Sequence, residues 1–381
     1  MAGNTFGTLF KLTTFGESHG IGLGVTIDGC PAGIPLEEAD IQKELDRRRP
    51  GAHTEDSDGT PRSPKLNPAG TSRKEDDKAE ILSGVYKGFT TGTPIAIIVR
   101  NTGQKPEDYN SIATKFRPGH ADYPFFTKYG VRDHRGGGRS SGRETIGRVA
   151  AGAVAKKVLA TKGIFVKAWT SEAVGIACTT FEEADIEQND MRACNNKAAE
   201  LMMERIIELK GAGDSGGGII TCRVSGGELG LPVGMGEPVF DKLDATLAHA
   251  ILSIGAIKGI EFGTGFECAK LKGSEHNDPM RINAITGKPE FLTNHAGGIL
   301  GGLSSGADIV FRAAVKPVSS ISIMQQTIDS DGKECEIEVR GRHDVCLCPR
   351  IVPVIEAMTA IVILDLYLRG QSAQAFKKEG L

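Results

Sequence analysis

A glycine-rich turn joined to a helix is the feature that most restricts how this chain can fold. Gly136 to Gly138 are followed by Arg139-Ser140-Ser141 and then by a helix-forming run over residues 144–161. Consecutive glycines adopt backbone conformations that other residues avoid, and a helix N-terminus carries about half a positive charge. Backbone N–H groups in such a turn are typical of sites that bind anions. The pattern therefore favours a phosphate or carboxylate ligand at this turn.

The same turn has two other interpretations. A glycine-rich turn before a helix is often only a tight loop, and arginines among glycines also occur on RNA-binding surfaces. The tract is neither a P-loop nor a GxGxxG motif, since no Gly-Lys-Ser/Thr ends it. The preceding turn, Pro118-Gly119-His120-Ala121-Asp122, favours a ligand site, because histidine is the side chain suited to moving protons near neutral pH.

Composition narrows the class of protein. The chain has 381 residues, 39% of them hydrophobic, and a formal net charge of −3, whereas a general nucleic-acid binder is usually basic. We expect no signal peptide, and we predict no run near the roughly 18 apolar residues that span a membrane. The eight cysteines are scattered, with Cys346 and Cys348 as the close pair. We therefore expect free thiols in a reducing cytoplasm and no metal site.

Apolar patterns place the elements along the chain. Strands are predicted over residues 6–15, 22–28, 81–86, 93–100, 164–169, 216–224 and 308–315. Helices are predicted over residues 36–49, 144–161, 179–210, 237–257 and 353–368. Residues 51–80 have almost no apolar pattern and indicate a long mobile loop, either a lid or a disordered segment. The elements lack a regular βαβ rhythm, so we predict an α+β fold that is neither Rossmann nor TIM barrel.

Three further motifs carry candidate ligand groups. His19 stands between glycines in the turn Gly16-Glu17-Ser18-His19-Gly20, where a plain surface histidine is the alternative. Arg47-Arg48-Arg49 ends a predicted helix, so at least one of them complements the helix dipole while one or two could face a ligand. Lys316-Pro317-Val318-Ser319-Ser320 follows a predicted strand, and ligands often bind where strands end.

Several of these motifs together resemble the chorismate synthase family. Its three signatures are matched by Gly16 to Gly29, by Gly138 to Thr145 and by Gly341-Arg342-His343-Asp344. The segments RRRPG, RPGHAD, NHAGGILGG and KPVSS also match in the family's order. The resemblance covers residues 1–370 and leaves 371–381 as a C-terminal tail. It implies one large β-α-β sandwich domain and a homotetramer.

The resemblance implies a monofunctional lyase of the shikimate pathway to aromatic amino acids. Such an enzyme converts 5-enolpyruvylshikimate 3-phosphate to chorismate and phosphate by a 1,4-anti elimination. It requires reduced FMN although no net oxidation occurs, and NADPH takes part only indirectly, by supplying reduced flavin. The chain shows no added flavin-reductase domain, so reduced FMN would come from outside. We expect a cytoplasmic enzyme with no nucleic-acid or membrane partner.

The resemblance also assigns roles to residues. His19 would act near the leaving phosphate, His120 beside the pyrimidine side of the flavin, and Asp344 would pass on the proton accepted by flavin N5. The anionic groups of the substrate, or NADP, would be bound by Arg48, Arg73, Arg117, Arg143 and Arg342, with Arg62 as the alternative to Arg73. FMN would be held by Arg139, Ser140, Ser141, Gly255, Ala256, Gly301, Lys316, Pro317, Val318, Ser319, Ser320 and Arg342. Many relatives have Asn at the position of Gly255, so that side-chain contact is absent here.

Two rival functions belong to other classes. A polyanion-binding or RNA-binding protein would show an affinity that falls steeply with salt and no dependence on flavin. A flavoprotein oxidoreductase would consume NADPH with every turnover. The near-neutral net charge and the two glycine-flanked histidines favour the lyase.

Overall fold

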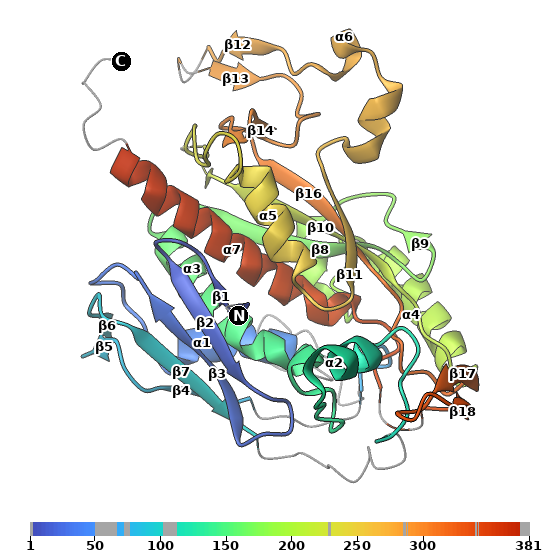
Figure 1. The fold of residues 1–381 in the computed structure, drawn as a ribbon. Helices are drawn as coiled ribbons and strands as arrows, with labels where there is room; N and C mark the ends of the chain where they lie inside the picture. Colours follow the sequence, from blue (N-terminus) through green and yellow to red (C-terminus); the bar gives the residue numbers. More distant parts are fainter. Residues whose placement is uncertain are drawn as a thin grey trace.

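Two antiparallel sheets with helices between them make up the described part of the chain (Figure 1). The computed structural model describes residues 3–49, 67–71, 77–101, 113–227, 230–284, 287, 289–339, 341 and 343–373. Most of the predicted loop 51–80 lies outside these segments. The layers form the expected β-α-β sandwich of an α+β fold, and neither sheet is parallel or closed into a barrel.

The first sheet has five strands in the order β1-β2-β3-β7-β4. The strands are β1 (Thr5–Phe6), β2 (Lys11–Gly16), β3 (Gly22–Asp28), β7 (Ile95–Arg100) and β4 (Ala79–Ile81). In β7 the side chains of Ile95, Ile97 and Val99 are buried and those between them are less so, as expected for a strand with one face on the core. The sheet therefore presents one apolar face to the helices.

The second sheet also has five strands, in the order β11-β16-β10-β8-β9. The strands are β11 (Ile257–Phe262), β16 (Ile309–Val315), β10 (Gly218–Ser225), β8 (Phe165–Ala173) and β9 (Ile176–Ala177). Short hairpins add β5 (Val85–Tyr86) with β6 (Phe89–Thr90), β12 (Met280–Ile282) with β13 (Pro289–Phe291), β14 (Ile299–Leu300) with β15 (Leu303–Ser304), and β17 (Gln325–Ile328) with β18 (Glu334–Ile337).

The helical layer is built around α3 and α7. The α-helices are α1 (Glu38–Arg48), α2 (Asp122–Tyr129), α3 (Thr145–Ala160), α4 (Asn196–Gly211), α5 (Leu243–Leu252), α6 (Gly273–His276) and α7 (Cys348–Ala373). A Cβ atom at Gly152 of α3 would lie 2.2 Å from Cβ of Ala357 in α7, so the two helices touch through small residues. The predicted apolar stripe of α3, which runs from Ile146 to Leu159, is buried as expected.

The long helix α7 forms the centre of the core. By length and apolar composition alone it could cross a membrane, so the prediction that the chain has no such apolar run was wrong. However, 89% of its most apolar window is buried inside the protein. It also carries a buried carboxylate, Glu356, which accepts hydrogen bonds from Arg47 (2.7 Å) and Lys156 (2.5 Å). A charge paired with groups of α1 and α3 in this way is typical of a core helix in contact with other helices.

A second buried carboxylate of α7 holds the N-terminal segment. Oδ1 of Asp365 accepts backbone N–H groups from Thr8 (3.0 Å), Leu9 (2.6 Å) and Phe10 (2.8 Å). Each polar group left unsatisfied after burial costs about 1–3 kcal/mol.

We expect Asp365→Ala to lower the free energy of unfolding by about 3 kcal/mol or more, measured by urea denaturation. The control Asp241→Ala removes an exposed partner of Arg369 and should change the free energy of unfolding by less than about 1 kcal/mol.

Three predicted helices are wrong in extent, and one of them, predicted over residues 353–368, is the longer helix α7 (Cys348–Ala373). The predicted helix 179–210 is instead a 3-10 turn, η4 (Glu183–Gln188), followed by the separate helix α4. The break occurs because Asn195 caps α4, its side chain accepting the N–H of Ala198 at 2.8 Å. The predicted helix 237–257 is helical only within α5. Helix α2 was not predicted, because Pro124 obscures it, although proline is tolerated in a first helical turn.

Candidate active site

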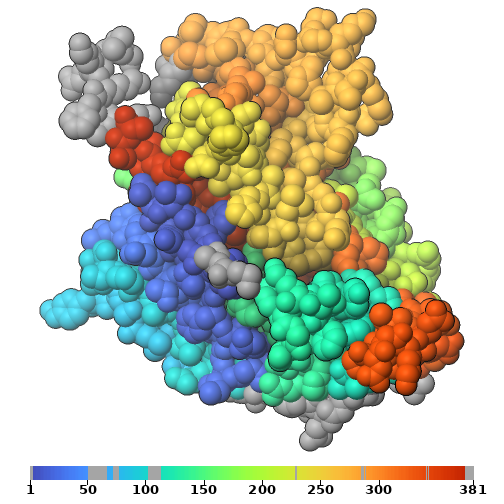
Figure 2. Space-filling view, in the orientation of Figure 1, coloured from blue at the N-terminus to red at the C-terminus, as the bar shows by residue number. Residues whose placement is uncertain are grey.

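A large cavity lies where the first sheet, the helical layer and the segment after β16 meet. Its volume is about 1400 Å³. Figure 2 shows the face on which the N-terminal strands (blue), α2 (teal) and α5 (yellow) come together. Among the described residues that line the cavity, nine are basic and two are acidic. The basic residues are Arg48, Arg117, Lys128, Arg139, Arg143, Arg148, Lys258, Lys316 and Arg350, and the acidic residues are Glu144 and Asp344. The cavity is therefore cationic in a chain of net charge −3.

The glycine turn lies between the two candidate histidines. Gly136, Gly137 and Gly138 have φ angles of 66°, 86° and 54°, in the left-handed region that favours glycine. A Cβ atom at Gly136 would lie 2.4 Å from Cε1 of His19, and one at Gly137 would lie 3.1 Å from Cε1 of His120. The glycines thus let backbone pass between two imidazole rings that are distant in sequence.

The hydroxyls after the glycines shape the turn. The chain makes two 3-10 turns, η2 (Gly138–Ser140) and η3 (Gly142–Glu144), before α3 begins. Oγ of Ser140 donates to the carbonyl of Gly137 at 2.7 Å, and Oγ of Ser141 accepts the N–H of Arg143 at 3.3 Å. The predicted order of glycines, hydroxyls and helix is present, with two tight turns inserted between the glycines and the helix.

His19 and its neighbour Ser18 are both buried. Nδ1 of His19 lies 3.0 Å from Oγ of Ser18, and that hydroxyl lies 3.3 Å from the carbonyl of Arg135. A carbonyl only accepts, so the serine O–H donates to Arg135 and its oxygen can accept the Nδ1 proton of His19. This arrangement fixes the ring of His19 at the cavity wall.

His120 belongs to a group of charged residues around Asp122. The Asp122 carboxylate, 3% exposed, lies 2.9 Å from Nδ1 of His120 and accepts Nε of Arg117 at 2.7 Å. Burial most strongly affects the His120 pKa and lowers it from its usual value, Asp122 opposes this effect, and the positive charges of Arg117 and Lys316 add to it. His120 is therefore largely neutral at neutral pH.

Arg48 and Arg143 share one buried carboxylate. Nη2 of Arg48, which is 1% exposed, donates to Asp77 at 2.6 Å, and Nη1 of Arg143 lies 2.9 Å from the other oxygen of Asp77. Burial acts to raise the pKa of Asp77, but the two guanidinium groups outweigh it and hold the pKa below its usual value. The ionised carboxylate thus holds together two arginines that come from α1 and from the glycine turn.

Asp344 is held by hydrogen bonds to both of its oxygens. Oδ1 accepts the backbone N–H of Thr71 at 3.0 Å, and Oδ2 accepts Nη1 of Arg350 at 2.6 Å. Nε of Arg350 also donates to the carbonyl of Arg48 at 3.3 Å. The short described segment 67–71 is therefore tied to the cavity through Asp344.

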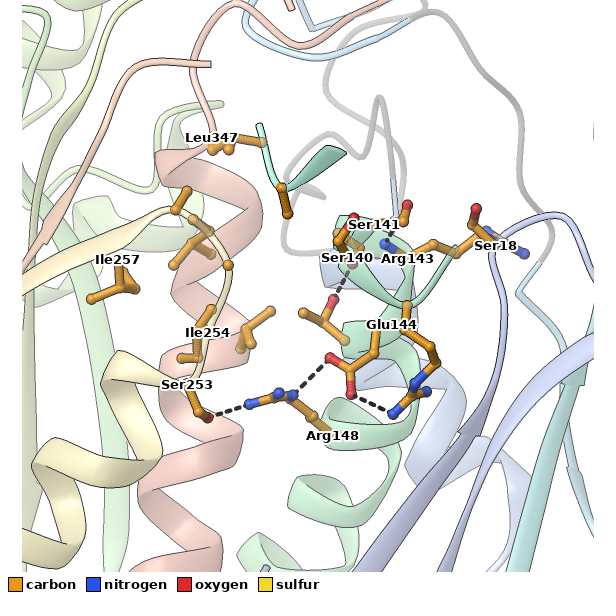
Figure 3. Close-up of a pocket in the computed structure, with 18 of the residues that line it drawn as sticks. Ser18, Ser140, Ser141, Arg143, Glu144, Arg148, Ser253, Ile254, Ile257 and Leu347 are labelled. Atoms are coloured by element: carbon orange, nitrogen blue, oxygen red, sulfur yellow. Dashed lines mark hydrogen bonds and ion pairs between the residues drawn. The ribbon is translucent and has the colours of Figure 1, made fainter. Parts of the chain in front are cut away.

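Figure 3 shows two unlike walls of the cavity. On one side lie Ser140, Ser141 and Arg143 from the glycine turn, and on the other lie the apolar side chains Ile254, Ile257 and Leu347. Arg148 joins the walls, because it donates to Glu144 at 2.8 Å and to Ser253 at 2.5 Å. The cavity can therefore hold a flat ligand with one apolar and one polar edge.

Comparison with known proteins identifies the family of this chain. A family model described as chorismate synthase matches residues 10–368. The chorismate synthases of Nitratidesulfovibrio vulgaris (strain Hildenborough) and Lachnospira eligens are each 51% identical, over 368 and 377 residues. The alignments cover 97% of this chain and 97% of the former protein, and 98% of this chain and 97% of the latter. The chain belongs to the chorismate synthase family.

A solved crystal structure of a chorismate synthase supports the fold. It matches with a TM-score of 0.72 and 30% identity, over 96% of this chain and 93% of that one. Membership of the chorismate synthase family makes the chain a lyase that acts on a small molecule in aromatic amino acid biosynthesis. These relatives give no support to the interpretation as a polyanion-binding or RNA-binding protein.

Most of the predicted site residues line this one cavity. They are His19, Arg48, Arg117, His120, Arg139, Ser140, Ser141, Arg143, Gly255, Ala256, Lys316, Pro317, Val318, Ser319, Ser320 and Asp344. Gly301 does not line it, since it lies in the turn between β14 and β15, and its predicted role stays a prediction. Arg73, its alternative Arg62, and Arg342 lie outside the described residues.

Sequence reasoning missed the residues that hold the predicted ones in place. Asp77 had no local signal, because it pairs with residues far away in the chain. Arg350 was not singled out, although it follows its partner Asp344 by six residues. Asp122 stood inside the RPGHAD motif and could have been found there, as the only carboxylate next to the histidine. Arg139, predicted to bind the cofactor, donates to the carbonyl of Gly16 (3.1 Å) and to Oγ1 of Thr14 (2.7 Å), so it also fixes the glycine turn on β2.

Proposed function

We propose that this enzyme eliminates phosphate from 5-enolpyruvylshikimate 3-phosphate in a 1,4-anti sense to form chorismate, with reduced FMN bound in the same cavity. The observation that carries the proposal is one cationic cavity with His19, His120 and Asp344 on its wall. The substrate bears a phosphate and two carboxylates, and arginine binds both groups with charge-assisted hydrogen bonds.

The residues present fit a flavin together with a substrate. The cavity volume, about 1400 Å³, exceeds the roughly 300–1,000 Å³ of a pocket for one small ligand. The apolar wall near Ile254 and Leu347 suits the hydrocarbon edge of a flavin, while Lys316 and residues 317–320 offer a cation, backbone groups and hydroxyls. Bound reduced FMN would supply an electron-rich ring that weakens the C–O bond to phosphate.

The arginines would bind and orient the substrate. Arg48 and Arg143 approach the cavity from two elements and are held together by Asp77, so their guanidinium groups are already arranged before an anion binds. Preorganised donors require little rearrangement during the reaction and stabilise charge as it develops. The role of this pair is therefore to bind carboxylate or phosphate oxygens.

His19 and Asp344 would handle charge and protons at opposite ends of the substrate. His19, whose Nδ1 lies 3.0 Å from Oγ of Ser18, lines the cavity, and its protonated ring could donate to the leaving phosphate. Asp344 can take up a proton on a carboxylate oxygen, and Arg350 and Thr71 position that carboxylate.

The proposal is tested by an anaerobic assay with 5-enolpyruvylshikimate 3-phosphate and photoreduced FMN. We expect equal amounts of chorismate and phosphate, many turnovers for each equivalent of reductant, and no product with oxidised FMN. Absence of flavin-dependent product would overturn the proposal. Consumption of one NADPH per product would instead indicate the oxidoreductase.

Arg48→Ala should chiefly weaken substrate binding. Loss of a charge-assisted contact costs about 1.5–3 kcal/mol, so we expect KM to rise about 10- to 100-fold with a smaller change in kcat. Steady-state kinetics under anaerobic conditions measures both parameters. The matched control is Arg49→Ala, its exposed neighbour paired with Asp46, which should leave KM unchanged. An unchanged KM in Arg48→Ala would remove Arg48 from the substrate site.

We further propose that the enzyme is a cytoplasmic homotetramer. The eight cysteines are all free, which suits a reducing compartment. Large apolar side chains are exposed near the β12–β13 hairpin, including Phe266 (81% exposed), Ile282 (64%) and Met280 (58%). This region projects at one end of the molecule (light orange in Figure 2), and such patches mark protein–protein contacts. Light scattering after gel filtration should give four times the chain mass, and a monomer would contradict the proposal.

A further inference from the structure

The Asp122 carboxylate is the most heavily hydrogen-bonded acid beside the cavity. It accepts the backbone N–H of Arg117 (3.1 Å), Nε (2.7 Å) and Nη2 (2.9 Å) of the same arginine, and it lies 3.2 Å from Nη1 of Arg132. Burial acts to raise its pKa, but hydrogen bonds from Arg117 and His120 outweigh that effect and hold the pKa well below its usual range. Asp122 is therefore ionised and can only accept.

This fact favours one nitrogen of His120 as the site of the proton. Nδ1 of His120 lies 2.9 Å from Oδ1 of Asp122 and 3.1 Å from Nη2 of Arg117. If Nδ1 were bare, it could accept the second Nη2 hydrogen of Arg117, but its lone pair would also face a carboxylate oxygen 2.9 Å away, which is repulsive. If Nδ1 carries the proton, it donates to Asp122, and Nη2 of Arg117 donates to the same oxygen at 2.9 Å. The second arrangement satisfies all three groups.

We propose that Asp122 is a positioning residue that fixes His120 as the Nδ1–H tautomer, so that the lone pair of Nε2 is free to act in the cavity. The same carboxylate orients the guanidinium of Arg117 at the cavity wall. A histidine that donates one N–H to a carboxylate has its ring orientation fixed and its other nitrogen made more basic.

The tautomer of His120 determines whether the ring first accepts or first donates a proton. A neutral ring with a bare Nε2 accepts a proton or a hydrogen bond from a ligand and becomes a donor only after it has been protonated. Its charged neighbours are Asp122, Arg117 and Arg132 from the surrounding loop and α2, and Lys316 from the segment after β16. Asp122 is the one acid among them, so it alone favours a proton on His120.

The geometry also requires the glycine turn. A Cβ atom at Gly137 would lie 3.1 Å from Cε1 of His120 and 3.5 Å from Nη2 of Arg117. Any side chain there would press on the ring and on the guanidinium that Asp122 holds. The glycine therefore leaves room for the Asp122–His120–Arg117 arrangement.

The test uses nuclear magnetic resonance of the flavin-free enzyme with 15N-labelled histidine, and His120→Gln assigns the signal. We expect wild-type His120 to show a protonated Nδ1 and a bare Nε2 when neutral. In Asp122→Asn the pKa of His120 should fall, and the Nε2–H form should become populated. The control Asp133→Asn, which removes the partner of exposed Arg135, should change neither quantity.

Two outcomes would overturn the inference. One is a wild-type ring with its proton on Nε2, a measurement that needs no folded variant. The other is an Asp122→Asn protein with unchanged His120 pKa and tautomer.

An activity measurement extends the test, and this part rests on the proposed function. In Asp122→Asn we expect turnover to fall about 10- to 100-fold, with the pH-profile limb governed by His120 moved to lower pH. Asp122→Glu should restore the limb in part. An enzyme without flavin-dependent turnover would contradict the proposed function. The tautomer and pKa of His120 could still be measured by nuclear magnetic resonance.

Discussion

His120→Ala is expected to lower the turnover number by about 10²- to 10⁴-fold, the contribution typical of a positioned acid or base. The variant removes the ring that Asp122 and the glycine turn hold at the cavity wall. It should leave the core intact, because the His120 side chain is 17% exposed and does not belong to the hydrophobic core cluster. Turnover is measured anaerobically with photoreduced FMN, and circular dichroism checks the fold.

The control for this variant is His276→Ala, a histidine of the short helix α6 that does not line the cavity. It should retain wild-type turnover. Wild-type turnover in His120→Ala itself would remove His120 from the mechanism, and a lost fold would be seen as changed circular dichroism rather than as a kinetic effect.

Asp344→Asn should cause the second large loss, again about 10²-fold or more in turnover. An amide has nearly the shape of the carboxylate but cannot take up a proton near neutral pH. Its NH2 group would also face a donor, since one oxygen of Asp344 accepts Thr71 N–H and the other accepts Arg350. The expected signature is a reduced kcat with substrate binding that changes much less.

Binding and turnover are separated by measuring kcat and KM for Asp344→Asn, together with the affinity for FMN. Asp241→Asn, an exposed acid that pairs with Arg369, serves as the control and should match wild type. A variant with unchanged kcat would show that Asp344 only anchors the segment 67–71.

Apolar spacing in the sequence predicted those helices whose boundaries do not depend on distant contacts. The stripe from Ile146 to Leu159 has helical spacing, and the structure buries it in α3 as expected. The predicted helix 179–210 failed because Asn195 caps a new helix and Ala193 pairs with Thr170 of β8. A contact with a distant strand does not appear in the local hydrophobic periodicity, so the periodicity could not predict where this helix begins.

The candidate site was predictable where glycines or family motifs marked it. His19 and His120 are flanked by glycines in the sequence, and the structure places both beside Gly136 and Gly137. Asp77 could not be found in the same way, because it lies 29 residues from the Arg48 that it pairs with. Ionic partners of this kind are fixed only when the chain has folded, so sequence reasoning named the arginines but not the acid that holds them together.

The position of α7 at the centre of the core has a consequence for biosynthesis. This helix packs against α1, α3 and both β8 and β10, and it anchors residues 8–10 through Asp365, yet a ribosome makes it after all of them. The apolar faces of these earlier segments therefore stay uncovered until α7 has been made. Nascent chains of this protein should depend on chaperones until α7 has been made, and messages with a premature stop before residue 348 should yield aggregated or degraded product.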